Sequence, residues 1–186
     1  FECPNINQKQ LAKELATALK KLQMIDCCNG PEAGQHNFFR GGDLKVYEDQ
    51  TLKALKTLEN RLPVKQLKNI WDTCTSKKYT KKNVWVHGDI APGNILLKNN
   101  QFYGIIDFGI LGTGDPACDY AMAWTYFDDN ARKVFLAGLP DDMVSRARGW
   151  ALWKALITYD DVNEDAKKNA RYTVDVILKE NNILRQ

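Results

Sequence analysis

Residues 87–94, HGDIAPGN, decide the fold of this chain together with residues 106–109, IDFG. The two stretches carry three oxygen-bearing side chains, those of Asp89, Asn94 and Asp107. Asn94 follows Asp89 by five positions, and Asp107 follows Asn94 by thirteen. These three side chains can form one site only if the segment between Asn94 and Asp107 folds back on itself.

That segment has the pattern of a β-hairpin. Residues 95–97 are Ile-Leu-Leu, as in a short buried strand, residues 98–101 form a polar turn, and residues 102–106 form the returning strand. A hairpin brings its two ends together, so Asn94 and Asp107 are expected to share a cation. Magnesium is a hard ion that takes oxygen ligands, usually one or two side chains completed by phosphates and water.

Asp89 adds a proton acceptor to this pair. In the phosphoryl-transfer template, a loop Asp accepts the proton of the acceptor hydroxyl. An Asn five residues later and the Asp of a D-F-G turn hold the magnesium ions that bridge the ATP phosphates. The spacing therefore predicts Asp89 as catalytic base, Asn94 and Asp107 as Mg²⁺ ligands, and ATP as the phosphoryl donor.

With these motifs the chain resembles the aminoglycoside phosphotransferase (APH) family, part of the kinase-like superfamily that includes choline and homoserine kinases. The resemblance covers roughly residues 1–160 and rests on HGDIAPGNILL (87–97), IIDFGILGTGDPACDYAMAW (105–124) and RGWALWKAL (148–156). It implies a mostly helical α+β fold, the C-terminal lobe of the protein-kinase-like fold, over residues 1–186, with a small hairpin carrying the active-site loop. It also implies ATP-dependent transfer to a small-molecule hydroxyl, aminoglycoside-like, in the cytoplasm.

Two parts of a complete kinase are not found upstream of residue 87. There is no Gly-x-Gly-x-x-Gly loop and no Val-Ala-Ile-Lys-like strand to cover and pair the ATP phosphates. We therefore expect a lobe without its N-terminal nucleotide lobe, and little or no kinase activity from this chain alone. The short interval from Asp107 to Asp115, in place of a long activation segment, favours a small-molecule kinase.

Other residues of the motifs are expected to support the site. His87 is predicted to be a packed histidine that braces the loop, and Gly88 and Gly93 allow tight backbone turns. Gly88 and Gly109 are also expected to give structural support to the site. Asp115, before Pro116, is predicted to cap a helix. Asp119 is predicted to complement the dipole of that helix and, by the family resemblance, to be structural.

The acceptor site is less defined by the sequence. A polycationic sugar needs an acidic pocket, and four acidic pairs are candidates: Asp128-Asp129, Asp141-Asp142, Asp160-Asp161 and Glu164-Asp165. We prefer Asp160 and Asp161, which follow the RGWALWKAL run, although acidic pairs are usually solvated helix ends. The loop 26–42 is either tucked in by its aromatic residues or forms a rim of the acceptor pocket. Trp124, Trp150 and Trp153 are expected in the core.

Composition sets outer bounds. A length of 186 residues with 44% hydrophobic and 26% charged residues fits one globular domain. A net charge of +3 is too mild to indicate nucleic acid, and no apolar run approaches the ~20 residues of a membrane span. The five cysteines lack metal-site spacing and are expected to be reduced: Cys3, Cys27, Cys28, Cys74 and Cys118.

Periodicity and caps predict a helical first part, a small β centre and a helical end. Helices are expected over 7–24, 46–62, 64–74, 115–127, 129–137, 141–159 and 163–180, with a strand at 83–86. Two other functions stay open. One is a metabolite kinase acting on choline, homoserine or a sugar, and the other is a non-enzymatic remnant or scaffold of a kinase lobe.

Overall fold

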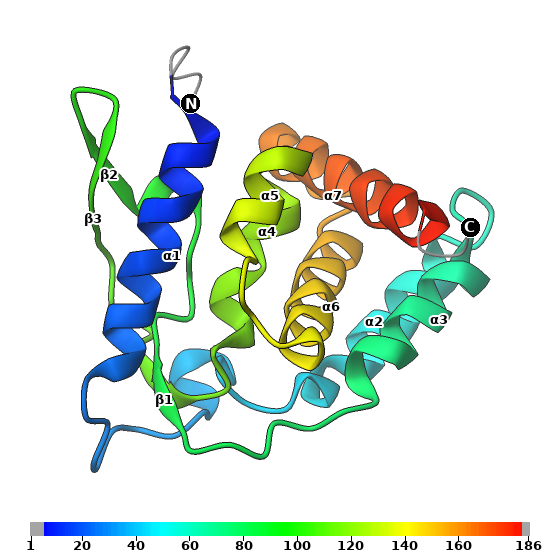
Figure 1. Cartoon of the computed structure of the whole chain (residues 1–186). Helices are drawn as coiled ribbons and strands as arrows, with labels where there is room; N and C mark the ends of the chain where they lie inside the picture. The colour runs from blue at the N-terminus through cyan, green and yellow to red at the C-terminus, as the bar shows by residue number, and fades with distance from the viewer. Residues whose placement is uncertain (1–5, 184–186) are drawn as a thin grey trace.

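The computed structural model describes residues 6–183, and most of them are helical (Figure 1). The α-helices are α1 (Gln8–Met24), α2 (Glu48–Thr57), α3 (Val64–Thr75), α4 (Met122–Thr125), α5 (Asp129–Phe135), α6 (Asp141–Ile157) and α7 (Glu164–Ile183). Short 3-10 helices are η1 (Gln35–Asn37), η2 (Leu44–Tyr47), η3 (Pro92–Asn94) and η4 (Pro116–Tyr120). Two antiparallel pairs of strands complete it, β1 (Val84–Val86) with β4 (Gly112–Gly114) and β2 (Ile95–Lys98) with β3 (Gln101–Ile105).

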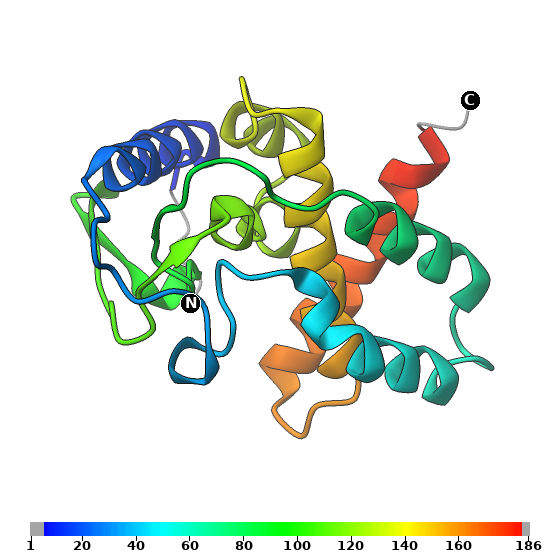
Figure 2. The ribbon, with the colours of Figure 1, turned by 90° about the horizontal axis from the view of Figure 1, so that it is seen from below.

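Helix α6 lies at the centre of the molecule, with α2, α3, α7 and η4 packed around it (Figure 2). Its buried residues are found all round the helix rather than on one stripe, as expected for a helix enclosed by neighbours. Small residues allow the close approach: a Cβ on Gly149 would lie 2.4 Å from Cδ2 of Leu44. The core therefore surrounds the RGWALWKAL run.

Helix α1 confirms the sequence prediction closely. Leu11, Leu15 and Leu19 form its buried stripe, and Oδ1 of Asn7 caps it by accepting the backbone N–H of Gln10 at 3.1 Å. The other candidate cap, Asn5, lies outside the described residues. The helix packs against α5 and β1 and runs beside the β2–β3 hairpin (Figure 1).

Two predicted helices were wrong in extent. The segment 115–127 is not one helix, because η4 ends at Tyr120 and the separate α4 begins only at Met122. The segment 46–62 starts as the 3-10 helix η2, and α2 ends at Thr57. Its last residues form turns instead, since Pro63 disfavours helical backbone in the residue before it.

Strand β4 was missed, because its sequence Gly-Thr-Gly has low strand propensity. It pairs with β1 in the register Val84↔Gly114 to Val86↔Gly112. Glycine is required at the crossing point: a Cβ on Gly114 would lie 2.1 Å from the carbonyl oxygen of Gly41. The loop 26–42 is thereby laid against the sheet that delivers residue 87.

Within residues 6–183, no helix combines the length and apolar character needed to cross a membrane. Cys27, Cys28, Cys74 and Cys118 are free thiols, and Cys3 lies outside the described residues.

Candidate active site

The loop 87–94 leaves β1 and returns through η3, and it brings Asp89 and Asn94 into contact. Nδ2 of Asn94 donates to the carbonyl oxygen of Asp89 at 2.8 Å and to its Oδ2 at 3.1 Å. Since both contacts use the amide nitrogen, Oδ1 of Asn94 stays available as a ligand. The Asp89 side chain is exposed, so it can meet a substrate hydroxyl.

The hairpin brings Asp107 to the same place. Strands β2 and β3 pair Ile95 with Ile105, and the N–H of Ile106 then donates to the carbonyl oxygen of Asn94 at 3.0 Å. Asp107 is the next residue, and its φ of +64° turns the chain out of the strand direction. The predicted hairpin is therefore confirmed, with a turn at Asn99 and Asn100, both at positive φ.

The donor set at this end of the hairpin fits magnesium. Asn94 offers an amide oxygen and Asp107 an exposed carboxylate, both of them hard ligands. In the described part of the chain, no group of three or more His, Cys, Asp or Glu side chains could hold a metal ion. Two protein ligands suit an ion whose remaining ligands are phosphate and water oxygens.

His87 joins the two motifs from inside the protein. It is fully buried, and its Nδ1 accepts the N–H of Asp89 at 3.2 Å. The other ring nitrogen, Nε2, therefore carries the proton and donates to the carbonyl oxygen of Ile106 at 2.9 Å. The ring also contacts the ring of Phe108 edge to face, with centroids 4.7 Å apart. These contacts connect the loop 87–94 with the end of the hairpin at Ile106.

Asp119 holds the same loop from η4. Its carboxylate accepts the backbone N–H of His87 at 2.8 Å and that of Gly88 at 2.7 Å. Burial raises the pKa of Asp119 to about 6, against the opposing effect of the two N–H groups. Asp119 stands in the first turn of η4, and its carboxylate also holds the loop. Gly88 has a φ of +84°, and a Cβ there would lie 3.0 Å from the carbonyl oxygen of Ile110.

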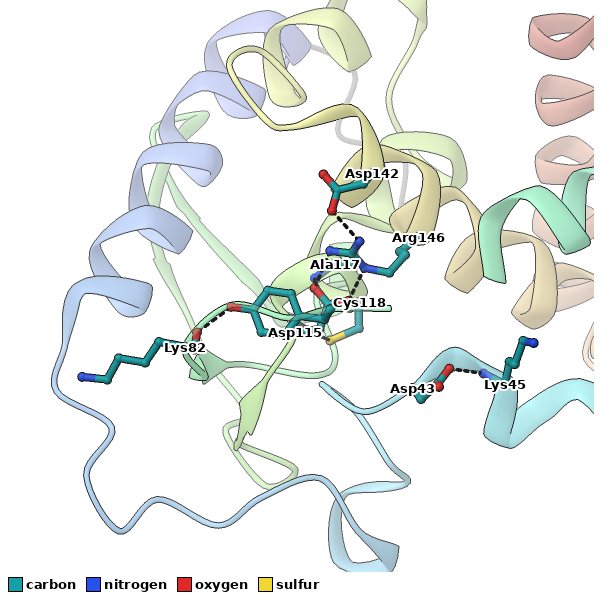
Figure 3. A network of polar contacts seen from close by, with 9 residues as sticks. Asp43, Lys45, Lys82, Asp115, Ala117, Cys118, Asp142 and Arg146 are labelled. Carbon is teal, nitrogen blue, oxygen red and sulfur yellow. Dashed lines mark hydrogen bonds and ion pairs between the residues drawn. The ribbon is translucent and has the colours of Figure 1, made fainter. Parts of the chain in front are cut away.

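Asp115 ties η4 to α6 (Figure 3). Its Oδ1 accepts the N–H of Ala117 at 3.1 Å, which confirms the predicted cap, and its Oδ2 accepts Nε of Arg146 at 2.6 Å. Arg146 also donates from Nη1 to Asp142 at 2.8 Å. Burial raises the pKa of Asp115, and Arg146 opposes that rise. Sequence reasoning missed Arg146, although its i,i+4 spacing from Asp142 was a signal.

One pocket, about 270 Å³ in volume, extends from Asp89 towards α6. Neither Asn94 nor Asp107 lines it. The pocket is lined by residues from several elements, among them Arg40, Asp89, Cys118, Trp150, Trp153 and Lys154. Trp150 and Trp153 are largely buried, as predicted, yet they form part of this wall. Arg40 shows that the loop 26–42 reaches the pocket next to Asp89.

The acidic pairs lie elsewhere. Asp160 accepts Nη1 of Arg61 at 2.9 Å, and together with Asp161 it lines a separate pocket of about 380 Å³ beside α2. The structure thus does not place this preferred pair in the pocket that contains Asp89. In the other acidic pairs, Asp128 caps α5. The remaining partners form ion pairs with basic side chains, namely Asp129 with Arg132, Asp142 with Arg146, and Glu164 with Lys167.

Several solved structures share the fold. A mutant aminoglycoside 2'-phosphotransferase-IIIa in its GDP complex superposes with a TM-score of 0.55 at 17% identity, covering 94% of this chain and 62% of that one. The apoenzyme of macrolide 2'-phosphotransferase MphH from Brachybacterium faecium superposes with a TM-score of 0.53 at 15% identity, covering 91% of this chain and 63% of that one. A thermostable mutant of aminoglycoside phosphotransferase APH(4)-Ia superposes with a TM-score of 0.55 at 15% identity, covering 96% of this chain and 70% of that one.

These likenesses confirm the predicted fold class, a mostly helical α+β lobe of the kinase-like fold. The chain spans less than two thirds of the length of the first two structures. No curated protein matches the sequence significantly. The model of the APH family, described as the phosphotransferase enzyme family, matches residues 5–156. The chain therefore belongs to the APH phosphotransferase enzyme family.

Proposed function

We propose that this chain provides the acceptor-binding and metal-binding lobe of an enzyme that transfers the γ-phosphoryl group of ATP to a small-molecule hydroxyl. One observation carries the proposal: Asn94 contacts Asp89 directly, and the hairpin delivers Asp107 beside Asn94. The proximity of these three residues in the backbone supports the roles that phosphoryl transfer needs, one proton acceptor and two oxygen ligands.

Asp89 has the role of base in this proposal. It is exposed and borders the pocket, so an acceptor hydroxyl bound there can give its proton to the carboxylate. Asn94 and Asp107 would hold Mg²⁺, which when bound neutralises charge on the phosphates. His87 and Asp119 keep Asp89 aligned through the loop backbone. Alignment and charge neutralisation account for most of the catalysis, because the transition state is loose.

In this proposal, nucleotide binding requires a further part of the protein. The chain spans 62–63% of the length of two phosphotransferases of the same fold. We propose that a nucleotide-binding lobe completes the enzyme, and that residues 1–186 alone transfer phosphate poorly or not at all. The alternative is that the chain is a non-enzymatic remnant or scaffold of a kinase lobe.

The acceptor class has two candidates. Aminoglycoside and macrolide phosphotransferases are among the proteins with this fold, and an aminoglycoside-like acceptor was our expectation from the sequence. The second candidate is a metabolite-type kinase with an acceptor that is not a polycation. It is favoured by the charges of the pocket, where Arg40 and Lys154 accompany Asp89.

The test uses the longest open reading frame that contains this chain. Transfer of labelled γ-phosphate from Mg²⁺-ATP is measured for a panel of cationic, neutral and anionic hydroxyl compounds. Replacement of the base, Asp89→Asn, should lower kcat about 10²- to 10⁴-fold for whichever acceptor is used. Asp107→Ala should abolish transfer, while Asp175→Asn, on the exposed face of α7, should leave it unchanged.

Two results would contradict the proposal. One is the absence of transfer to every compound by the wild-type protein, which would favour the scaffold. The other is undiminished transfer by the Asp89→Asn protein.

A further inference from the structure

The pocket beside Asp89 has an unexpected balance of charge. Among the residues that line it, the charged ones are Arg40, Lys154 and Asp89 itself. Apart from the proposed base, the pocket therefore offers only cations. A site for a polycationic sugar would need several carboxylates, and the acidic pairs of the chain serve as caps and ion-pair partners elsewhere.

The guanidinium of Arg40 lies against two tryptophan rings. It lies 5.0 Å from the ring of Trp150 and 4.9 Å from that of Trp153, and among residues 6–183 it forms no ion pair. Its Nη1 is buried without a hydrogen-bond acceptor, and so is Nε1 of Trp150. Uncompensated charge and unpaired donors are costly in a protein, and an anion rich in acceptor atoms relieves both.

The loop that carries Arg40 is fixed before any ligand arrives. The buried Asn37 accepts the N–H of Gly34 at 3.0 Å and donates to the carbonyl oxygen of Arg40 at 3.0 Å. The hydroxyl of Tyr47 donates to the carbonyl oxygen of Phe38 at 2.6 Å. The Tyr47 ring in turn stacks on Trp153 with centroids 3.8 Å apart. Such a support gives a binding group a set position.

The position of Arg40 favours the acceptor over the phosphates of the donor. The pocket contains Asp89 but neither Asn94 nor Asp107, the two residues proposed to hold the metal of the nucleotide. Its wall also includes Lys154, one turn from Trp150 on α6. The two cations thus share the side of Asp89 that faces α6.

We propose that this pocket binds an acceptor that carries an anionic group as well as a hydroxyl, such as a sugar acid or hydroxy acid. Arg40 and Lys154 bind the anion, and the hydroxyl is presented to Asp89. The assignment rests on the proposed phosphotransferase function for the meaning of the hydroxyl. It makes Arg40 a specificity-determining residue.

The test compares three sugars of one ring type that differ in charge: glucuronate, glucose and glucosamine. Binding at pH 7 is followed by tryptophan fluorescence, since Trp150 and Trp153 line the pocket. Glucuronate should bind about tenfold or more tightly than glucose, because a hydrogen-bonded charge pair is added. Glucosamine, largely cationic at this pH, should bind more weakly than glucose.

Variants then locate the anion. Arg40→Gln and the exposed Lys154→Gln should each weaken glucuronate binding, Arg40→Gln by about tenfold or more, and leave glucose binding nearly unchanged. Lys133→Gln, exposed and outside the pocket, is the control with the same loss of charge. Circular dichroism establishes whether each variant is folded. If Arg40→Gln does not fold, the Lys154→Gln variant still tests the proposal.

The proposal is overturned if glucuronate fails to bind, if all three sugars bind equally, or if glucosamine binds best. It is also overturned if Arg40→Gln weakens binding of magnesium triphosphate but not of glucuronate, since Arg40 would then serve the donor. Phosphate transfer to cationic acceptors alone would refute it and leave the phosphotransferase function intact. Glucuronate binding by the protein made from the longest open reading frame, without transfer to any acceptor, would refute that function and leave the anion site.

Discussion

At the scale of single residues, Asp119 is the clearest case of a buried charge that serves the loop. Its carboxylate is fully buried, yet both oxygens accept backbone N–H groups of the loop 87–94. Burial penalises the ionised form, and the two N–H groups favour it. The net result is a pKa raised from 3.8 to about 6, so the ionised form that holds the loop is costly.

This raised pKa predicts a pH-dependent stability. Between about pH 4 and pH 6 the folded protein holds the Asp119 proton more tightly than the unfolded chain, so raising the pH through this window lowers the free energy of unfolding. A pKa raised from 3.8 to about 6 corresponds to about 3 kcal/mol. Urea unfolding at pH 4 and pH 6.5 should show most of this loss, about 2 kcal/mol, in wild type relative to Asp119→Asn. Parallel pH profiles of the two proteins would contradict it.

At the scale of secondary-structure elements, the joint between η4 and α6 depends on one buried ion pair. The side chains of Arg146 and Asp115 are 7% and 4% exposed, and Nε and Oδ2 lie 2.6 Å apart. Removal of one partner from such a pair leaves an uncompensated buried charge, whereas exposed pairs contribute little. The joint also fixes where η4, and with it Asp119, meets the loop 87–94.

The substitution Arg146→Met should therefore lower the free energy of unfolding by about 3–5 kcal/mol, measured by urea denaturation. The matched control is Arg61→Met, which removes the partner of Asp160 from a pair about half exposed on each side. That change should cost no more than about 1 kcal/mol. Adding Asp115→Asn to Arg146→Met should recover part of the loss. Equal effects of the two arginine substitutions would show that the joint is not stabilised in this way.

The same elements explain which features the sequence could predict. Helix α1 and the hairpin depend on local signals, namely a cap, a leucine stripe and a polar turn, and both were confirmed. The spacing of Asp89, Asn94 and Asp107 predicted that they would lie together, and their chemical roles stay predictions. Strand β4 could not be predicted, because a Gly-Thr-Gly segment becomes a strand only through pairing with β1. The loop that contains Arg40 was one candidate for the pocket rim, but the contact of Arg40 with α6 could not be predicted, because Trp150 and Trp153 are more than a hundred residues away.

At the scale of the whole molecule, four helices meet at Glu180 of α7. Its Oε2 accepts Nε1 of the fully buried Trp124 of α4 at 2.7 Å. Its carboxylate also lies 3.9 Å from Nε of Arg132 in α5 and 3.8 Å from Nη1 of Arg148 in α6. Since α7 follows the 5–156 segment that matches the family model, this carboxylate is where the C-terminal helix is joined to that segment.

Glu180→Ala should accordingly lower the free energy of unfolding by about 1–3 kcal/mol, because it leaves a buried indole N–H without its acceptor and removes the carboxylate that two arginines face. Glu164→Ala, at the start of the same helix and paired with Lys167 in an exposed position, should change stability by less than about 0.5 kcal/mol. Urea unfolding followed by tryptophan fluorescence and by circular dichroism measures both variants. If α7 is an integral part of the core, the two signals should change together for Glu180→Ala as for wild type. An early, separate loss of helical signal would instead mean that α7 unfolds on its own, and that Glu180 joins it only loosely to the lobe that carries Asp89.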